Sequence, residues 1–290
     1  MQLTLDEALQ KGIEAHKAGR IQEADSFYTA ILNAQPEHPD ANHNMGALAV
    51  GIGKLEDALP FFKKALDSNP TVNQYWLSYA EALIKLKRFD EATKNLQSVI
   101  KKQPDFLEAH YNLGILHTQN GSLNEAMASY KRALEIQPNY AEAHYNLGNI
   151  YKEKEQPDNA LEHYRIAVAA KPNYAMAYNN MGTVFKKKND LNAALENFKQ
   201  AIDIDPESAE SHYNLGTVLN DQYDLDSAII SFQKAINIKP SYPEAYNGIG
   251  IIKAEVGKPD EAISYFRRAL DIKPGYQAPY INIGSALAQK

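Results

Sequence analysis

Residues 141–174 read AEAHYNLGNIYKEKEQPDNALEHYRIAVAAKPNY, and this stretch is one copy of a unit that recurs along the chain. Its proline, Pro172, belongs to a series of eight that follow one another every 34 residues without insertion or deletion: Pro36, Pro70, Pro104, Pro138, Pro172, Pro206, Pro240 and Pro274. A fixed period of this length is typical of short helical units stacked end to end. Because such arrays present extended surfaces, the period favours a binding function over catalysis.

Placing each proline at position 32 of its unit divides the chain into repeats. We expect one array over residues 1–290, with repeats at 5–38, 39–72, 73–106, 107–140, 141–174, 175–208, 209–242 and 243–276. Residues 277–290 are expected to form the first helix of an incomplete ninth repeat.

Small and aromatic residues recur at fixed positions and predict two antiparallel helices per repeat. Position 8 is glycine except at Ala80, position 20 is always alanine, and position 24 is aromatic except at Leu96. At about 100° per residue, positions 4, 7, 8 and 11 share one face of the first helix, and positions 20, 24 and 27 share one face of the second. Small residues at 8 and 20 let the two backbones approach, and the aromatic ring fills the space beside them.

This pattern resembles the tetratricopeptide repeat family over essentially the whole chain, with Trp76 at the family's position 4. The resemblance implies an all-α fold, a right-handed superhelix of helix-turn-helix hairpins whose first helices line the concave side. It also implies protein or peptide partners held in the concave groove.

Composition narrows the class of protein further. The net charge of −6 argues against general affinity for nucleic acid or an anionic membrane. The chain has no cysteine, and no apolar run reaches the length of a membrane span. The N-terminus carries Asp6 and Glu7 and lacks a basic-then-apolar leader, so we expect a cytoplasmic protein. Thr4 and Glu7 instead predict a capping box that opens the first helix.

Position 6 of the first helix carries the candidate binding residues. It lies about 200° from position 4, nearly opposite the buried face, so packing within the hairpin does not explain it. An exposed amide offers an acceptor and two donors to a peptide backbone, whatever the side chains of that peptide. The predicted peptide-binding residues, called the asparagine row below, are Asn44, Asn112, Asn146, Asn180, Asn214 and Asn282.

Two alternatives to a simple peptide ladder remain open. The asparagines could reflect drift from a consensus, or they could bond to adjacent helices. Alternatively, Ala143–Glu153 together with Glu162–Arg165 is similar to the repeats of O-linked N-acetylglucosamine transferases, whose position-6 asparagines grip the substrate backbone. That resemblance implies a substrate-recruiting region for a glycosyltransferase, or another transferase, with its catalytic domain beyond residue 290.

The C-terminal residues suggest a further contact. Within residues 277–290 the only charge is Lys290, and we expect Ile281, Ile283 and Leu287 to be exposed. The chain could therefore be a piece of a longer protein, its end could be covered by a partner, or it could self-associate. A mildly apolar capping helix is the alternative.

No catalytic, metal or cofactor site is predicted. His110, His144 and His212 all occupy position 4, so we interpret them as packing residues and not as metal ligands. Gly51–Lys54 lacks the Ser or Thr and the strand–loop–helix context of a phosphate loop. Acidic residues dominate position 2, as at Glu142 and Glu210, and would repel a peptide carboxylate.

Overall fold

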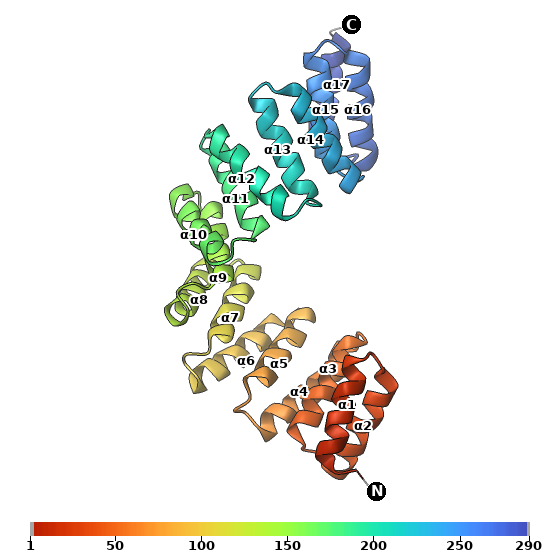
Figure 1. Ribbon diagram of the computed structural model, residues 1–290, viewed down its shortest axis with the longest axis vertical. Coiled ribbons are helices and arrows are strands. Elements are labelled where there is room, and N and C mark those ends of the chain that lie inside the picture. The colour runs from red at the N-terminus through yellow and green to blue at the C-terminus, as the bar shows by residue number, and fades with distance from the viewer. Residues whose placement is uncertain (1–2, 289–290) are drawn as a thin grey trace. The chain divides into compact units, whose positions relative to one another are not determined.

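The computed structural model describes residues 3–288, which form 17 α-helices and no strand (Figure 1). The helices belong to two compact units, Met1–Pro138 and Asn139–Lys290. Within each unit, consecutive helices pack as antiparallel pairs, and each pair packs against the next. The all-α, helix-turn-helix fold class expected from the sequence is confirmed.

The first unit contains eight helices: α1 (Leu5–Lys17), α2 (Ile21–Ala34), α3 (Pro39–Gly51), α4 (Leu55–Ser68), α5 (Asn73–Lys85), α6 (Phe89–Lys102), α7 (Leu107–Gln119) and α8 (Leu123–Ile136). The second contains nine in its described part: α9 (Ala141–Glu153), α10 (Pro157–Ala170), α11 (Ala175–Lys187), α12 (Leu191–Ile204), α13 (Ala209–Asp221), α14 (Leu225–Ile238), α15 (Pro243–Glu255), α16 (Pro259–Ile272) and α17 (Gln277–Ala288). Odd-numbered helices are the first helices of their hairpins, and even-numbered helices are the second.

A glycine–ring contact holds seven of the eight described hairpins together. A Cβ atom placed on Gly182 of α11 would lie 2.6 Å from Cε1 of Phe198 on α12, so only glycine admits the ring at this distance. Every alanine at position 20 is fully buried, as expected for the closest approach of the two helices. The hairpin interior therefore depends on the small residues that the sequence repeats.

The third repeat replaces both partners of this contact. Ala80 of α5 stands where the other repeats have glycine, and Leu96 of α6 stands where they have a ring; both are fully buried. The methyl group of Ala80 occupies space that a ring would need, and the narrower leucine leaves that space open. The two departures from the pattern therefore compensate each other.

The turn inside each hairpin requires a left-handed backbone. Gly19, Gly53, Gly121 and Gly257 have φ between 71° and 79° at these turns. The remaining four hairpins place non-glycine residues there, with φ between 56° and 64°: Lys87, Glu155, Asn189 and Tyr223. These four positions carry a steric cost that glycine avoids.

Position 4 also links successive hairpins. In at least five of the described repeats its side chain lies 2.8–3.2 Å from the carbonyl oxygen of the proline that ends the preceding hairpin. The five pairs are Asn42–Pro36, Trp76–Pro70, His110–Pro104, His212–Pro206 and Tyr280–Pro274. This bond satisfies the carbonyl of a proline just beyond the helix end, which explains how His110, His212 and Trp76 can be buried here.

The two ends of the described chain differ in how well they match expectation. The capping box is confirmed, because Thr4 Oγ1 accepts from the Glu7 backbone N–H while Glu7 accepts from the Thr4 N–H. In α17, Ile281 and Leu287 are 69% and 55% exposed, as expected. The expectation for Ile283 was wrong: it is half-buried against the cluster of Ile263, Phe266 and Ala286.

No described helix is long and apolar enough to cross a membrane. Residues 1–2 and 289–290 lie outside the described part of the chain, so the predictions about the N-terminal leader and Lys290 extend to residues beyond it.

Candidate peptide-binding surface

The asparagine row lies on first helices. Asn44 and Asn112 belong to α3 and α7 of the first unit, and Asn146, Asn180, Asn214 and Asn282 belong to α9, α11, α13 and α17 of the second. All six are half-buried, although the sequence predicts exposed side chains. The prediction considered only the partner within the hairpin, whereas neighbouring first helices within each unit also touch and cover part of position 6.

Position 6 is hydrogen-bonded to position 5 of the preceding first helix, 35 residues earlier. Asn214 Nδ2 donates to Asn179 Oδ1 at 3.0 Å, and Asn282 Nδ2 donates to Asn247 Oδ1 at 3.0 Å. In the first unit the same two positions are paired by other residue types, since Ser78 Oγ at position 6 lies 2.9 Å from His43 Nε2 at position 5. Part of the row therefore bonds to adjacent helices, which was one of the alternatives left open by the sequence.

Asn180 is the most fully engaged member of the row. Its Nδ2 donates to Tyr145 Oη at 3.1 Å and to Asn149 Oδ1 at 2.9 Å, while its Oδ1 accepts from Lys152 Nζ at 3.0 Å. Burial lowers the pKa of Lys152, and the nearby charge of Glu210 opposes that shift. The Asn180 amide thus has both donors and its acceptor occupied.

Two small cavities lie in the second unit, and Asn180 is the one member of the asparagine row that lines either of them. One, about 110 Å³, is lined by residues that include Tyr145, Asn180 and Glu210. The other, about 170 Å³, is lined by residues that include Tyr213 and Asn220. Both are smaller than the roughly 300–1,000 Å³ typical of small-molecule sites, so each suits a single amino-acid side chain. The buried Oδ1 of Asn220 has no hydrogen-bond partner at the second cavity.

The six asparagines do not form one uninterrupted set. In the first unit, α5 lies between α3 and α7 in chain order and carries Ser78 at position 6. In the second unit, α11 packs against α9 and α13, which makes Asn146, Asn180 and Asn214 the consecutive members, whereas Gly248 on α15 separates them from Asn282. The densest part of the row is therefore on α9, α11 and α13.

Sequence reasoning missed the partners of the row, including Tyr145, Asn179, Asn247 and Lys152. A signal was present in the second unit only: Asn146, Asn180, Asn214 and Asn282 each follow a polar or hydroxyl-bearing residue at position 5 by 35 residues, whereas a leucine stands 35 residues before Asn44 and Asn112. Within residues 3–288 no group of three or more His, Cys, Asp or Glu side chains could hold a metal ion.

Several family models match the chain. Models described as tetratricopeptide repeat match residues 9–73, 49–114, 83–128, 141–174 and 207–274, and a model described as TPR repeat matches residues 116–155 and 182–222.

Among curated proteins, Hsp70-Hsp90 organizing protein 1 of Glycine max is 25% identical over 100 residues, 34% of this chain and 18% of that protein. The peroxisomal targeting signal receptor of Kluyveromyces lactis is 27% identical over 103 residues, 35% of this chain and 18% of that protein. The chain thus spans less than a fifth of the length of these relatives.

Solved structures agree on the fold. The crystal structure of MamA is 30% identical, with a TM-score of 0.52 over 56% of this chain and 95% of that chain. YrrB, described as a TPR protein with an unusual peptide-binding site, is 24% identical, with a TM-score of 0.55 over 64% of this chain and 96% of that chain. The APC/C hetero-tetramer Cut9-Hcn1 is 18% identical, with a TM-score of 0.65 over 97% of this chain and 56% of that chain. From its repeats, its hairpins and these matches, the chain belongs to the tetratricopeptide repeat family.

Proposed function

We propose that this protein is an interaction scaffold whose second unit binds extended polypeptide along α9, α11 and α13. The observation that carries the proposal is the run of three consecutive position-6 amides, Asn146, Asn180 and Asn214, with a cavity of side-chain size that Asn180 lines. A peptide needs both backbone partners and places for its side chains, and this surface offers both.

The hydrogen bonds between first helices refine the role of each asparagine. Asn214 donates one N–H to Asn179, and the other hydrogen-bonding groups of its amide have no partner that the described residues supply. Asn180 is held by three neighbours, so we assign it to orienting Tyr145, which lines the first cavity, and to holding the Lys152 ammonium group. The remaining members, Asn44, Asn112 and Asn282, lie outside the surface on α9, α11 and α13, and they stay predicted peptide-binding residues only by their position in the repeat.

Similar proteins support this class of function. One relative is described as an organizing protein, another as a targeting signal receptor, and a structural neighbour as having a peptide-binding site. The second proposal from the sequence, recruitment of substrate for a glycosyltransferase, would use the same asparagine row. No contact within the described residues favours it over a scaffold.

The test is capture of random-sequence dodecapeptides by the full chain, measured by fluorescence anisotropy. The variant Asn146→Ala/Asn180→Ala/Asn214→Ala should weaken capture. A matched triple variant at exposed asparagines of second helices, Asn159→Ala/Asn192→Ala/Asn237→Ala, should not. Equal capture by the two triple variants would overturn the proposal.

A stability control is also needed, because the row contributes to folding. Ala160→Leu overpacks a fully buried position on α10 and should cost about 1–3 kcal/mol without touching the surface. If Ala160→Leu reduces capture as much as the asparagine variant does, the loss reflects unfolding and not the amides.

Self-association through α17 is a separate proposal. Its motivation is the exposure of Tyr280, Ile281 and Leu287 on one helix. Light scattering of the variant Ile281→Glu/Leu287→Glu should show a smaller mass than that of the parent chain; an unchanged mass would remove the proposal.

A further inference from the structure

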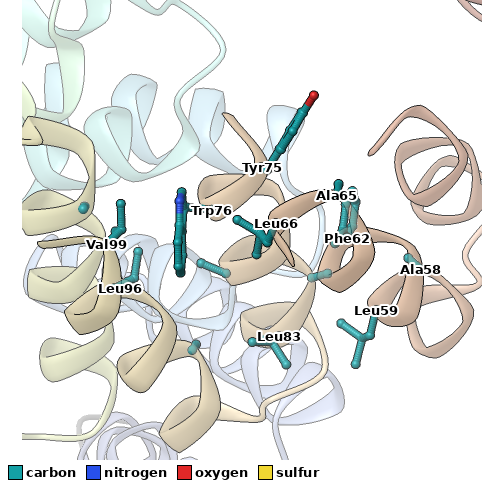
Figure 2. Packing of buried hydrophobic residues seen from close by; sticks show 14 of the residues in the cluster. Ala58, Leu59, Phe62, Ala65, Leu66, Tyr75, Trp76, Leu83, Leu96 and Val99 are labelled. Atoms are coloured by element: carbon teal, nitrogen blue, oxygen red, sulfur yellow. The ribbon is translucent and has the colours of Figure 1, made fainter. Parts of the chain in front are cut away.

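A third cavity, distinct from the proposed peptide surface, lies in the first unit between the second helices α4 and α6. Its volume is about 480 Å³, and we call it the α4–α6 furrow. Lys63 of α4 and Lys94 and Lys102 of α6 line it, and α5, which packs against both helices, contributes Trp76 and Tyr79. Figure 2 shows Trp76 between Leu66 of α4 and Leu96 and Val99 of α6.

One residue that lines this furrow has a buried oxygen without a hydrogen-bond partner among the described residues. Asn95 of α6 lines the cavity and is only 7% exposed, and its Oδ1 has no hydrogen-bond partner. A buried acceptor without a donor lowers stability, so its presence in a folded protein needs a reason. A ligand that brings an N–H group into the furrow supplies the missing donor.

The charges around the furrow point to an acidic ligand. None of Lys63, Lys94 and Lys102 forms an ion pair within the described residues, and the Lys102 ammonium lies 5.0 Å from the centre of the Trp76 ring. Of the two carboxylates that line the furrow, Glu91 is already bound by Arg88 at 2.6 Å, which leaves Asp67. The furrow is thus lined by three lysines and by one carboxylate, Asp67, that no ion pair in the described chain occupies. This region is therefore locally basic, although the net charge of the chain is −6.

We propose that the α4–α6 furrow binds an acidic segment of polypeptide. The Asp or Glu side chains of that segment would pair with Lys63, Lys94 and Lys102. A backbone N–H would donate to Asn95 Oδ1 once the side chains that cover this oxygen move aside. The aromatic ring of Tyr79 and the methylene stems of the lysines would contact its apolar groups. Inorganic phosphate lacks the N–H donor that Asn95 needs, and an open furrow between two helices suits a chain segment better than an enclosed metabolite.

The sole tryptophan of the protein reports on this site directly, because Trp76 lines it. The experiment titrates the full chain at low salt with a capped Asp-Glu-Asp-Phe-Glu-Asp peptide and follows Trp76 emission. We expect a saturable change, weakened by added salt. The capped Lys-Arg-Lys-Phe-Arg-Lys peptide should give none. A response to inorganic phosphate equal to that of the acidic peptide, or no response to the acidic peptide, would overturn the proposal.

Matched charge variants separate the furrow from the overall charge of the chain. Lys63→Gln/Lys94→Gln removes two lining cations, and Lys64→Gln/Lys101→Gln removes two exposed lysines of the same helices that do not line the furrow. The first pair should weaken binding by about threefold to tenfold, as expected for two solvent-exposed ion pairs. Equal weakening by both pairs would show a non-specific charge effect and contradict the site.

Asn95 provides an independent readout. Asn95→Leu, of similar volume, removes the unpaired oxygen, so the melting temperature should not fall while peptide binding weakens. A lower melting temperature with unchanged binding would assign Asn95 to the fold alone and overturn its role in the site. The asparagine variant of the second unit should bind the acidic peptide normally, so failure of one proposal does not depend on the other.

Discussion

The Nδ2 of Asn214 donates to the Oδ1 of Asn179 across neighbouring first helices, at a distance of 3.0 Å and a separation of 35 residues. Asn179 is buried and donates in turn to Glu210 at 3.0 Å. The asparagine row therefore has a structural role between repeats in addition to any role in binding.

This relationship predicts that Asn214→Ala and Asn179→Ala both destabilise the second unit. Asn214→Ala should cost about 1 kcal/mol, the typical worth of one hydrogen bond, and Asn179→Ala should cost more because it breaks two contacts. Urea unfolding of the single and double variants should give a coupling free energy of about 0.5–1.5 kcal/mol. If the destabilisation of the double variant equals the sum of the two single variants, the bond between Asn214 and Asn179 contributes nothing to stability.

The glycine–ring contact predicts a rescue. Gly182→Ala should cost about 1–3 kcal/mol, since the new methyl group would overlap the Phe198 ring. Adding Phe198→Leu recreates the Ala80–Leu96 pair of the third repeat, so the double variant should lose less than the sum of the single variants. Chemical denaturation of the parent, the two single variants and the double variant checks this. If the double variant loses as much stability as the two single variants together, the smaller leucine does not compensate for the added methyl group.

Tyr223 predicts a stabilising change. Its φ of 64° is left-handed, and its side chain is 85% exposed, so Tyr223→Gly relieves strain and removes few contacts. After subtracting the entropy cost of glycine, the gain should be about 0.5–1 kcal/mol. The neighbouring change Gln222→Gly, at φ −89°, should bring no gain. Calorimetry gives the unfolding temperature of each variant. A higher unfolding temperature for Tyr223→Gly alone indicates relief of backbone strain, and an equal rise for Gln222→Gly would contradict that explanation.

His43 predicts a pH dependence in the first unit. Burial lowers its pKa, while a hydrogen bond with Asn44 and the charge of Asp40 oppose that shift. The folded-state pKa then lies below the unfolded value of about 6.5, so the unfolded chain binds the proton first. The contribution of His43 to the free energy of unfolding is present above pH 6.5, and it is lost as the pH falls toward the pKa of His43 in the folded state.

The variant His43→Gln tests that sign. It does not titrate, and its amide can replace the contact with Ser78. The difference in urea midpoint between pH 7.5 and pH 5 should be smaller in the variant than in the parent. If the urea midpoints of the variant and of the parent change equally between these two pH values, groups other than His43 cause the acid sensitivity.

The sequence could predict the hairpins because their determinants are local. Gly182, Phe198 and the alanines at position 20 recur in phase, and Thr4 with Glu7 specifies a cap within one turn. Contacts between hairpins depend on how neighbouring helices are offset along their axes, and one repeat read alone contains no measure of that offset. The bond from Asn214 to Asn179 and the burial of Ile283 against α16 were missed for this reason.

Photo-cross-linking tests the central claim most directly, because the chain has no native cysteine. Met176 is 57% exposed and lines the cavity beside Asn180, so Met176→Cys places a benzophenone label at the proposed surface. Lys199→Cys, exposed on second helix α12, is the matched control. With random-sequence dodecapeptides, the account predicts cross-links from position 176 that excess unlabelled peptide suppresses, and few from position 199. Equal yields at the two positions, or a higher yield at 199, would contradict it.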